Sequence, residues 1–205
     1  MIFYVVILIM SVVIHEVSHG FMAEYFGDHT ARHAGRLTLN PLAHLDLFGS
    51  ILLPALLIIS KAGFLFGWAK PVPYNPANLS DRKWGTVWVA AAGVLSNFGL
   101  AIVFGIIMRI GAYVTLPVSI AADFYFVTSA IVIINLGLGI FNLVPIPPLD
   151  GSKILFSFLP SSMYGTLEVI EQYSFILLIV FIIYFSDVLY PILTTLFELI
   201  TGFGL

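Results

Sequence analysis

The sequence predicts an all-α fold, a polytopic membrane helical bundle that also contains a short extended or β segment and a re-entrant or broken helical hairpin. Composition is the first reason, because 60% of the 205 residues are hydrophobic and only 9% are charged, against about a quarter in soluble domains. The second reason is that apolar residues gather in runs of about 20, the length of a membrane-spanning helix. We expect one membrane domain over 1–205, with a core at about 1–155 and C-terminal helices at about 156–205.

The chain opens on an apolar run at about 1–25, which we expect to be a retained transmembrane helix, because it lacks the basic segment of a cleavable signal. The most polar stretch follows at 27–46, and within it residues 36–39 suggest a short extended piece. The next apolar run, at about 47–66, is interrupted by a proline, a lysine and a glycine. It is too short and broken for a full crossing, so a re-entrant hairpin or two short passes are predicted.

After a proline-rich connector, two further helical runs are predicted at about 84–110 and 121–143. The stretch at 152–172 is expected to be short, amphipathic and interfacial. The last apolar run, at about 173–201, contains an aspartate and a proline in its middle. We therefore expect either one long kinked helix or two short pieces there.

The polar residues of the first run form the pattern His-Glu-x-x-His at 15–19. At about 100° per residue, His15 and His19 project from one helix face a turn apart, so both imidazoles can bind one Zn²⁺. Glu16 then lies close enough to accept a proton from an attacking water. A chance match or two core histidines is the alternative. The metal interpretation is favoured because ionisable groups in hydrocarbon cost about 2.5 kcal/mol or more each and are rare without a function.

A catalytic zinc site commonly has three protein ligands, and the absence of cysteine leaves His and carboxylate as the available types. The candidate for the third ligand is Asp150, which follows the proline-rich segment at 142–149. Non-helical backbone at membrane depth is tolerated only where it is buried or lines a wet cavity, which is where a ligand could sit. A surface turn at Asp150-Gly151 is an equally good interpretation of this segment by itself.

Together the two motifs resemble those of the site-2 protease family of intramembrane zinc metalloproteases. That family pairs a His-Glu-x-x-His helix with a distant Asn-x-x-Pro-x-Pro-x-x-Asp-Gly segment, here at 15–19 and 142–151. A third family motif, Gly-Pro-x-x-Asn, is present at 93–97 with Val94 in place of the proline. The similarity spans about 1–155 and extends to features of a compact prokaryotic branch without appended domains.

The resemblance implies a role for each matching residue. His15, His19 and Asp150 would bind one Zn²⁺ per chain, Glu16 would be the catalytic base, and Asn142 would orient substrate or stabilise the oxyanion. The implied function is hydrolysis of peptide bonds in or near transmembrane segments of membrane protein substrates, as in regulated intramembrane proteolysis. We expect these substrates and the lipid bilayer as partners, and no nucleic acid, because the net charge is −3 and no basic run is present. A homo-oligomer or a regulatory membrane partner stays open.

Two other functions stay open at this point. A membrane metal transporter or metal sensor would also carry His and carboxylates in its helices, although its ligands should repeat along several of them. A catalytically silent relative would bind membrane proteins without cleaving them, although the intact Glu16 argues against this alternative.

A shared metal would require the first helix and the helix at 121–143 to end on the same side of the membrane. The helices at 84–110 and 121–143 then form a there-and-back pair, and the run at 47–66 cannot cross only once. Most basic residues fall on the active-site side, and only Arg109 falls opposite. The positive-inside rule therefore places the active site near the cytoplasmic face of a prokaryotic cell membrane, with the N-terminus outside. The residues on the active-site side are Arg32, Arg36, Lys61, Lys70, Arg82, Lys83 and Lys153.

Several other polar residues have no assigned role. His29, His33 and His44 are expected to be solvated loop histidines, with a second metal or a gating role as the alternative. Asp28 is expected to lie in water after the first helix. Asp187 is either a buried functional acid or the mark of an interfacial break in the last run.

Overall fold

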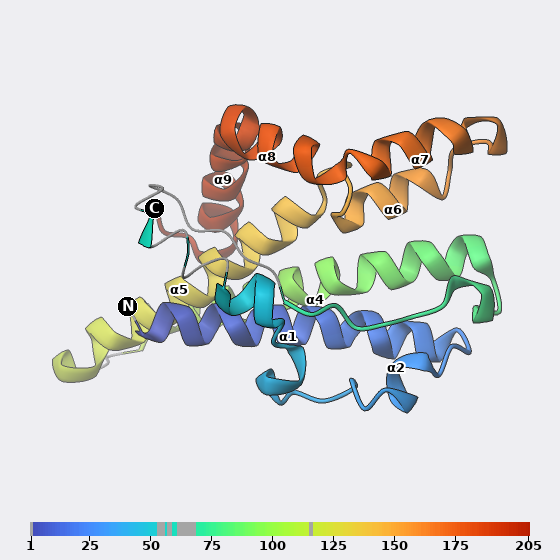
Figure 1. The fold of residues 1–205 in the computed structure, drawn as a ribbon. Coiled ribbons are helices and arrows are strands. Elements are labelled where there is room, and N and C mark those ends of the chain that lie inside the picture. The colour runs from blue at the N-terminus through green and yellow to red at the C-terminus, as the bar shows by residue number, and fades with distance from the viewer. Residues whose placement is uncertain (1, 53–55, 57–58, 61–68, 115–116) are drawn as a thin grey trace.

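The computed structural model describes residues 2–52, 56, 59, 60, 69–114 and 117–205, and these are built from helices without any strand (Figure 1). The α-helices are α1 (Ile2–Tyr25), α2 (Thr30–His33), α4 (Arg82–Gly111), α5 (Val118–Asn142), α6 (Asp150–Phe156), α7 (Tyr164–Gln172), α8 (Ser174–Phe185) and α9 (Leu189–Thr201). Shorter 3₁₀ turns are η1 (Pro41–His44), η3 (Pro76–Asn78), η4 (Ser161–Met163) and η5 (Ser186–Val188), and η2 (Leu47–Leu52) is a π-helical turn.

Three of these helices, α1, α4 and α5, are long and apolar enough to cross a membrane. Helices α7 and α8 pass the same test only when they are taken together. Because they meet at an angle of 64°, they count as one broken span at most. The chain is therefore an integral membrane protein. The three long helices confirm the helical runs predicted at 1–25, 84–110 and 121–143.

The three long helices pack against one another in alternating directions (Figure 1). The end of α1, the start of α4 and the end of α5 point toward the same end of the bundle. Helix α9 packs against α4 and α5, where Phe197 joins Ala101, Val132 and Leu136 in the main apolar core. A small residue such as Ala101 lets neighbouring helices approach closely. This arrangement is the there-and-back pair that a shared ligand set was expected to require.

Asp28 ties the polar connection after α1 to the segment before α4. Its carboxylate is fully buried and accepts hydrogen bonds from Thr30 Oγ1, the Asn75 backbone N–H and Asn78 Nδ2, at 2.5, 2.6 and 2.9 Å. The expectation that Asp28 lies in water is wrong, because these three donors replace the water. Burial raises the pKa of Asp28, but the hydrogen bonds outweigh it, and the net pKa is lowered.

The extended segment expected at 36–39 is irregular, because no strand pairs with it in the described part of the chain. Side-chain and isolated backbone hydrogen bonds hold this region instead. Arg36 Nη2 donates to the Lys70 carbonyl at 2.8 Å, and the Lys70 N–H donates to the His44 carbonyl at 2.8 Å. His44 itself is buried with Nε2 2.9 Å from the Thr38 carbonyl, so the expectation of a solvated histidine is wrong there. The other two loop histidines are exposed, as expected.

The hairpin predicted at 47–66 falls mostly outside the described residues. Its first part, Leu47–Leu52, forms the π-helical turn η2. The prediction of a re-entrant hairpin or two short passes therefore stays a prediction.

The C-terminal part decides between the alternatives left open for the last apolar run. The run is divided into two helices, α8 and α9, by the 3₁₀ turn η5. Asp187 lies in this turn and is exposed, so it marks the break and is not a buried acid. The stretch before it is also divided, into α6 and the amphipathic α7.

Candidate metal centre

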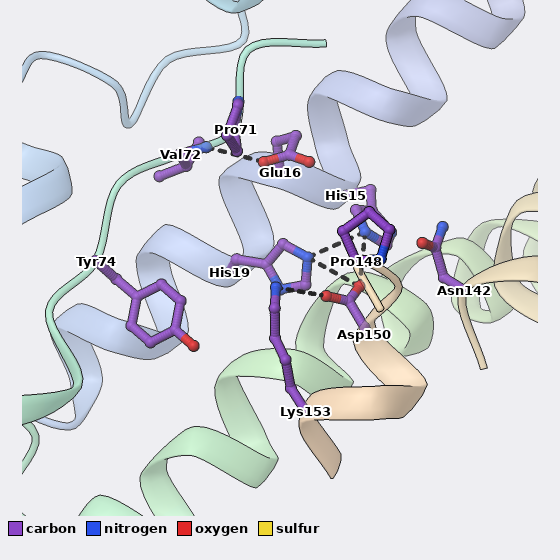
Figure 2. A pocket seen from close by; sticks show the side chains of 10 residues that line it. All are labelled: His15, Glu16, His19, Pro71, Val72, Tyr74, Asn142, Pro148, Asp150 and Lys153. Atoms are coloured by element: carbon purple, nitrogen blue, oxygen red, sulfur yellow. Dashed lines mark hydrogen bonds and ion pairs between the residues drawn. The ribbon is translucent and has the colours of Figure 1, made fainter. Parts of the chain in front are cut away.

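Three predicted ligands from distant parts of the chain converge at one pocket (Figure 2). His15 and His19 lie one turn apart on α1, and Asp150 is the first residue of α6. Asp150 Oδ2 is 3.0 Å from His15 Nε2 and 3.2 Å from His19 Nε2, and the two Nε2 atoms are 3.0 Å apart. All three side chains are buried, between 4% and 7% exposed. The structure thus brings together the three residues that the two motifs predicted.

A tight chain reversal delivers Asp150 to the histidines. Helix α5 ends at Asn142, and the prolines that follow prevent its continuation. The chain then folds back so closely that a Cβ on Gly151 would overlap the Leu143 carbonyl. Only glycine fits after Asp150, which explains the Asp-Gly pair better than a surface turn does, because both residues are buried.

Backbone and side-chain acceptors hold the far side of each imidazole ring. His19 Nδ1 lies 2.6 Å from the Val89 carbonyl, and His15 Nδ1 lies 2.6 Å from Asn97 Oδ1, both on α4. A carbonyl oxygen can only accept, so His19 carries a proton on Nδ1 and turns its Nε2 toward Asp150. This arrangement is the usual one behind a metal-binding histidine.

The donor atoms in the centre fit a metal ion. Asp150 Oδ2 is buried and has no hydrogen-bond partner among the described residues, although two imidazole nitrogens face it. One ligand atom from each of the three residues lies within 4.8 Å of the other two. Electron pairs without protons between them repel at such distances, and a cation among them removes the repulsion. Two imidazole nitrogens and one carboxylate form a donor set of the type that binds catalytic zinc.

Gly93 allows α4 to approach this centre. A Cβ at this position would lie 2.6 Å from His15 Cε1 and 2.6 Å from His19 Cε1 and Nε2. Gly93 and Asn97 are the first and last residues of the third motif. Gly93 leaves space for the two imidazole rings, and Asn97 is the hydrogen-bond partner of His15. Val94, which stands where the family has proline, is buried inside the uninterrupted helix α4.

Glu16 lies beside the three ligands on a shared cavity of about 140 Å³ (Figure 2). Its Oε2 accepts a hydrogen bond of 2.9 Å from the backbone N–H of Val72, and its side chain is half-buried. The neighbouring prolines, Pro71 and Pro73, have no N–H, so Val72 is the local donor. The residues lining the cavity are His15, Glu16, His19, Pro71, Val72, Tyr74, Asn142, Pro148, Asp150 and Lys153.

Asn142 lines the same cavity, so the structure places every predicted site residue there. Its Nδ2 donates to the Leu138 carbonyl at 3.0 Å. Lys153, which the motifs did not identify, donates from Nζ to Asp150 Oδ1 at 3.1 Å. Lys153 follows Asp150 by three residues, a spacing that brings two side chains together on one helix face, and this spacing could have indicated the contact.

Comparison with known proteins agrees with this geometry. Residues 108–185 match the model of peptidase family M50. The chain is 39% identical over 200 residues to the candidate zinc metalloprotease YwhC of Bacillus subtilis, covering 93% of this chain and 85% of that protein. The chain belongs to peptidase family M50, the site-2 protease family.

A second M50 relative is more distant. The chain is 30% identical over 178 residues to the candidate zinc metalloprotease Rip2 of Mycolicibacterium smegmatis, covering 85% of this chain. It spans 64% of the length of Rip2. No solved structure is significantly similar to the chain. The M50 membership confirms the family that the motifs at 15–19 and 142–151 resemble.

Proposed function

We propose that this M50 member is a zinc endopeptidase that hydrolyses peptide bonds in or near transmembrane segments of membrane protein substrates. The observation that carries the proposal is the buried cluster of ligand atoms from His15, His19 and Asp150, with a carboxylate, Glu16, on the same cavity. His15, His19 and Asp150 would hold one zinc ion per chain. When bound, zinc supplies a Lewis acid that activates water and polarises the scissile carbonyl.

Glu16 is placed to move the proton. It follows His15 directly on α1 and lines the cavity where water reaches the ligands. The Val72 N–H occupies one carboxylate oxygen and orients the group. The other oxygen has no recorded hydrogen bond among the described residues, so it is free to accept the proton of the attacking water and pass it to the leaving amine.

Asn142 would act on the substrate. It lies at the end of α5, at the last turn before the chain reverses toward Asp150. Its Nδ2 already bonds one helix carbonyl but has a second N–H, and an amide N–H near the cavity can orient or stabilise the scissile carbonyl oxygen. A substrate helix hides its carbonyls in its own hydrogen bonds, so local unwinding must precede this contact.

The charge distribution supports an active site near the cytoplasmic face of a prokaryotic membrane. The described basic residues on this side follow the end of α1, open α4, or lie on α6 after the end of α5; they are Arg32, Arg36, Lys70, Arg82, Lys83 and Lys153. Arg109 lies near the other end of α4. The positive-inside rule then places the N-terminus outside. Externally accessible residues between α1 and α4 in a labelling experiment would contradict this orientation.

The alternatives have less support. A metal transporter or sensor should repeat its ligands along a path, and within the described residues one buried group can hold a metal. A silent binding protein has no need for Glu16. Whether the chain forms a homo-oligomer or has a regulatory partner stays an expectation, as does the division of one domain over 1–205 into a core and C-terminal helices.

The test compares purified wild-type protein with Glu16→Gln and His19→Ala. We expect about one zinc per chain in the wild type and in Glu16→Gln, and a large loss in His19→Ala. Cleavage of a membrane-spanning peptide should occur with the wild type only and should stop with a chelator. Substantial cleavage by Glu16→Gln would refute the role of the base, and a metal-free but active wild type would refute the zinc enzyme.

A further inference from the structure

A network of buried polar side chains lies behind His15, at the level of the bundle where helices α1, α4 and α5 meet. Ser11, Asn97 and Asn135 come one from each helix and are 3%, 0% and 0% exposed. Buried polar groups in a membrane protein are costly unless they are fully hydrogen-bonded. These three residues satisfy one another, and the network ends on a proposed zinc ligand.

The hydrogen bonds form a chain from α5 to His15. Asn135 Nδ2 donates to Ser11 Oγ and to the Ile131 carbonyl, both at 2.9 Å. Asn135 Oδ1 accepts from Asn97 Nδ2 at 2.9 Å, and Asn97 Oδ1 faces His15 Nδ1 at 2.6 Å. Asn97 Nδ2 also lies 3.5 Å from the Ser11 carbonyl.

The chemistry of these partners sets the direction of the chain. The Ile131 carbonyl can only accept, so Asn135 must turn its NH₂ toward it and its oxygen toward Asn97. That oxygen can only accept, so Asn97 presents its NH₂ to Asn135 and its own oxygen to His15. His15 must then carry its proton on Nδ1. The inverted chain would place Asn135 Oδ1 against the Ile131 carbonyl at 2.9 Å, where two acceptors repel.

We propose that Asn135, supported by Ser11 and acting through Asn97, is a positioning residue that keeps His15 in the tautomer whose Nε2 can bind zinc. This inference rests on the proposed zinc site. His19 needs no such device, because the Val89 carbonyl fixes its tautomer directly. Asn97 is different, because an amide side chain can face a ring nitrogen with either its oxygen or its NH₂. Without Asn135, the Ser11 carbonyl is the remaining acceptor for Asn97 Nδ2 among the described residues, and at 3.5 Å it is too far away to hold the amide. Asn97 can then rotate and donate to Nδ1, and the His15 proton moves to Nε2, where it blocks the ligand.

The first experiment reads the tautomer in the metal-free wild type. Protein with ¹⁵N-labelled histidine is reconstituted in lipid, and the His15 ring signals are assigned by their loss in His15→Ala. At a pH where the ring is neutral, we expect Nδ1 protonated and Nε2 bare. A neutral ring protonated on Nε2 would overturn the proposal. This result does not depend on the stability of any Asn135 variant, nor on cleavage activity.

The second experiment measures zinc affinity by competition with a chelator. Asn135→Leu is expected to bind zinc about 10-fold or more weakly, within the range of about 10–100-fold typical of residues behind a metal ligand. Its His15 should also show protonated Nε2. The matched control is Thr128→Val, because Thr128 is a buried α5 residue whose hydroxyl, among the described residues, bonds only the Phe124 and Tyr125 carbonyls of its own helix. The control should keep wild-type zinc affinity and tautomer.

An alternative role for the network is to hold the helices together without affecting the ring. In that case Asn135→Leu would lower the unfolding temperature but leave the His15 tautomer and zinc affinity unchanged, which would overturn the proposal. Combining Asn135→Leu with Asn97→Asp should restore affinity, because a carboxylate accepts from Nδ1 whichever way it faces. A folded double variant that binds as weakly as Asn135→Leu would also overturn it. If Asn135→Leu does not fold, Asn135→Ala replaces it with the same readouts.

The two levels of failure are distinguishable. A wild type that binds no zinc, or an active Glu16→Gln variant, contradicts the proposed function whatever the tautomer of His15. The other case is a wild type that binds zinc and loses activity in Glu16→Gln, while its zinc affinity does not depend on Asn135. That result contradicts only the positioning role of Asn135 and leaves the proposed function standing.

Discussion

Replacing Gly93 with alanine tests the geometry of the metal centre most directly. A Cβ there would lie 2.6 Å from atoms of both rings, and ordinary contact begins at 3.4 Å, so the rings must move by about 0.8 Å. Metal–ligand distances tolerate only about 0.2 Å. The rings cannot move freely, because His19 Nδ1 is bonded to the Val89 carbonyl on the same helix at 2.6 Å. We expect zinc affinity to fall by about 100-fold, the upper range for changes behind a ligand, and overpacking to cost about 1–3 kcal/mol of unfolding free energy.

The assay is zinc competition with a chelator, combined with denaturant unfolding of the metal-free protein. Gly99→Ala is the matched control, because Gly99 lies on the same helix and a Cβ there would meet no heavy atom within 4 Å. It should keep wild-type affinity and gain up to about 0.5–1 kcal/mol from the lower backbone entropy of alanine in the unfolded chain. Wild-type zinc affinity in Gly93→Ala would refute the close packing of α4 against the two rings.

Three further predictions concern other groups. Lys153→Met should weaken zinc binding about 10-fold in the same competition assay, because Asp150 Oδ1 loses its only side-chain donor among the described residues. Asn142→Ala should keep zinc, measured by metal analysis, while kcat falls about 100-fold, as for a lost oxyanion donor. Asp28→Asn should lower the free energy of unfolding by about 1–3 kcal/mol at neutral pH. Since the folded pKa of Asp28 is lowered, this difference should be full above about pH 4, the unfolded pKa, and shrink as pH falls toward the folded pKa. A difference that stays constant in denaturant unfolding across that pH range would contradict the assignment.

Local pattern was sufficient for much of the site. The proposed ligands His15 and His19 follow from helical spacing, which depends only on the geometry of one α-helix. Glu16 follows from the same motif. Asp150 needed the pairing of two distant motifs, because a single Asp-Gly step fits a surface turn as well as a ligand.

The polar partners of these residues could not be predicted in the same way. Val72, Val89 and Asn135 reach the site from elements far away in the sequence, and Val72 and Val89 act through backbone atoms that every residue carries. Asp28 and His44 were expected in solvent because they lie in a polar stretch. They are buried because the described parts of the connection between α1 and α4 bond to each other, and their amides and carbonyls supply the hydrogen bonds that water would have made.

The sequence by itself determined the membrane environment, the three long helices and the ligand types, because hydropathy and helical periodicity are properties of consecutive residues. The tertiary structure alone decided that residues 36–39 have no strand partner in the described part of the chain, that the last run is two helices, and that Asn135 and Ser11 lie behind His15. Each of these depends on which segments meet in space. The effect of a lone pair, a free N–H or a missing Cβ depends on which atom the packing places within about 3 Å of it.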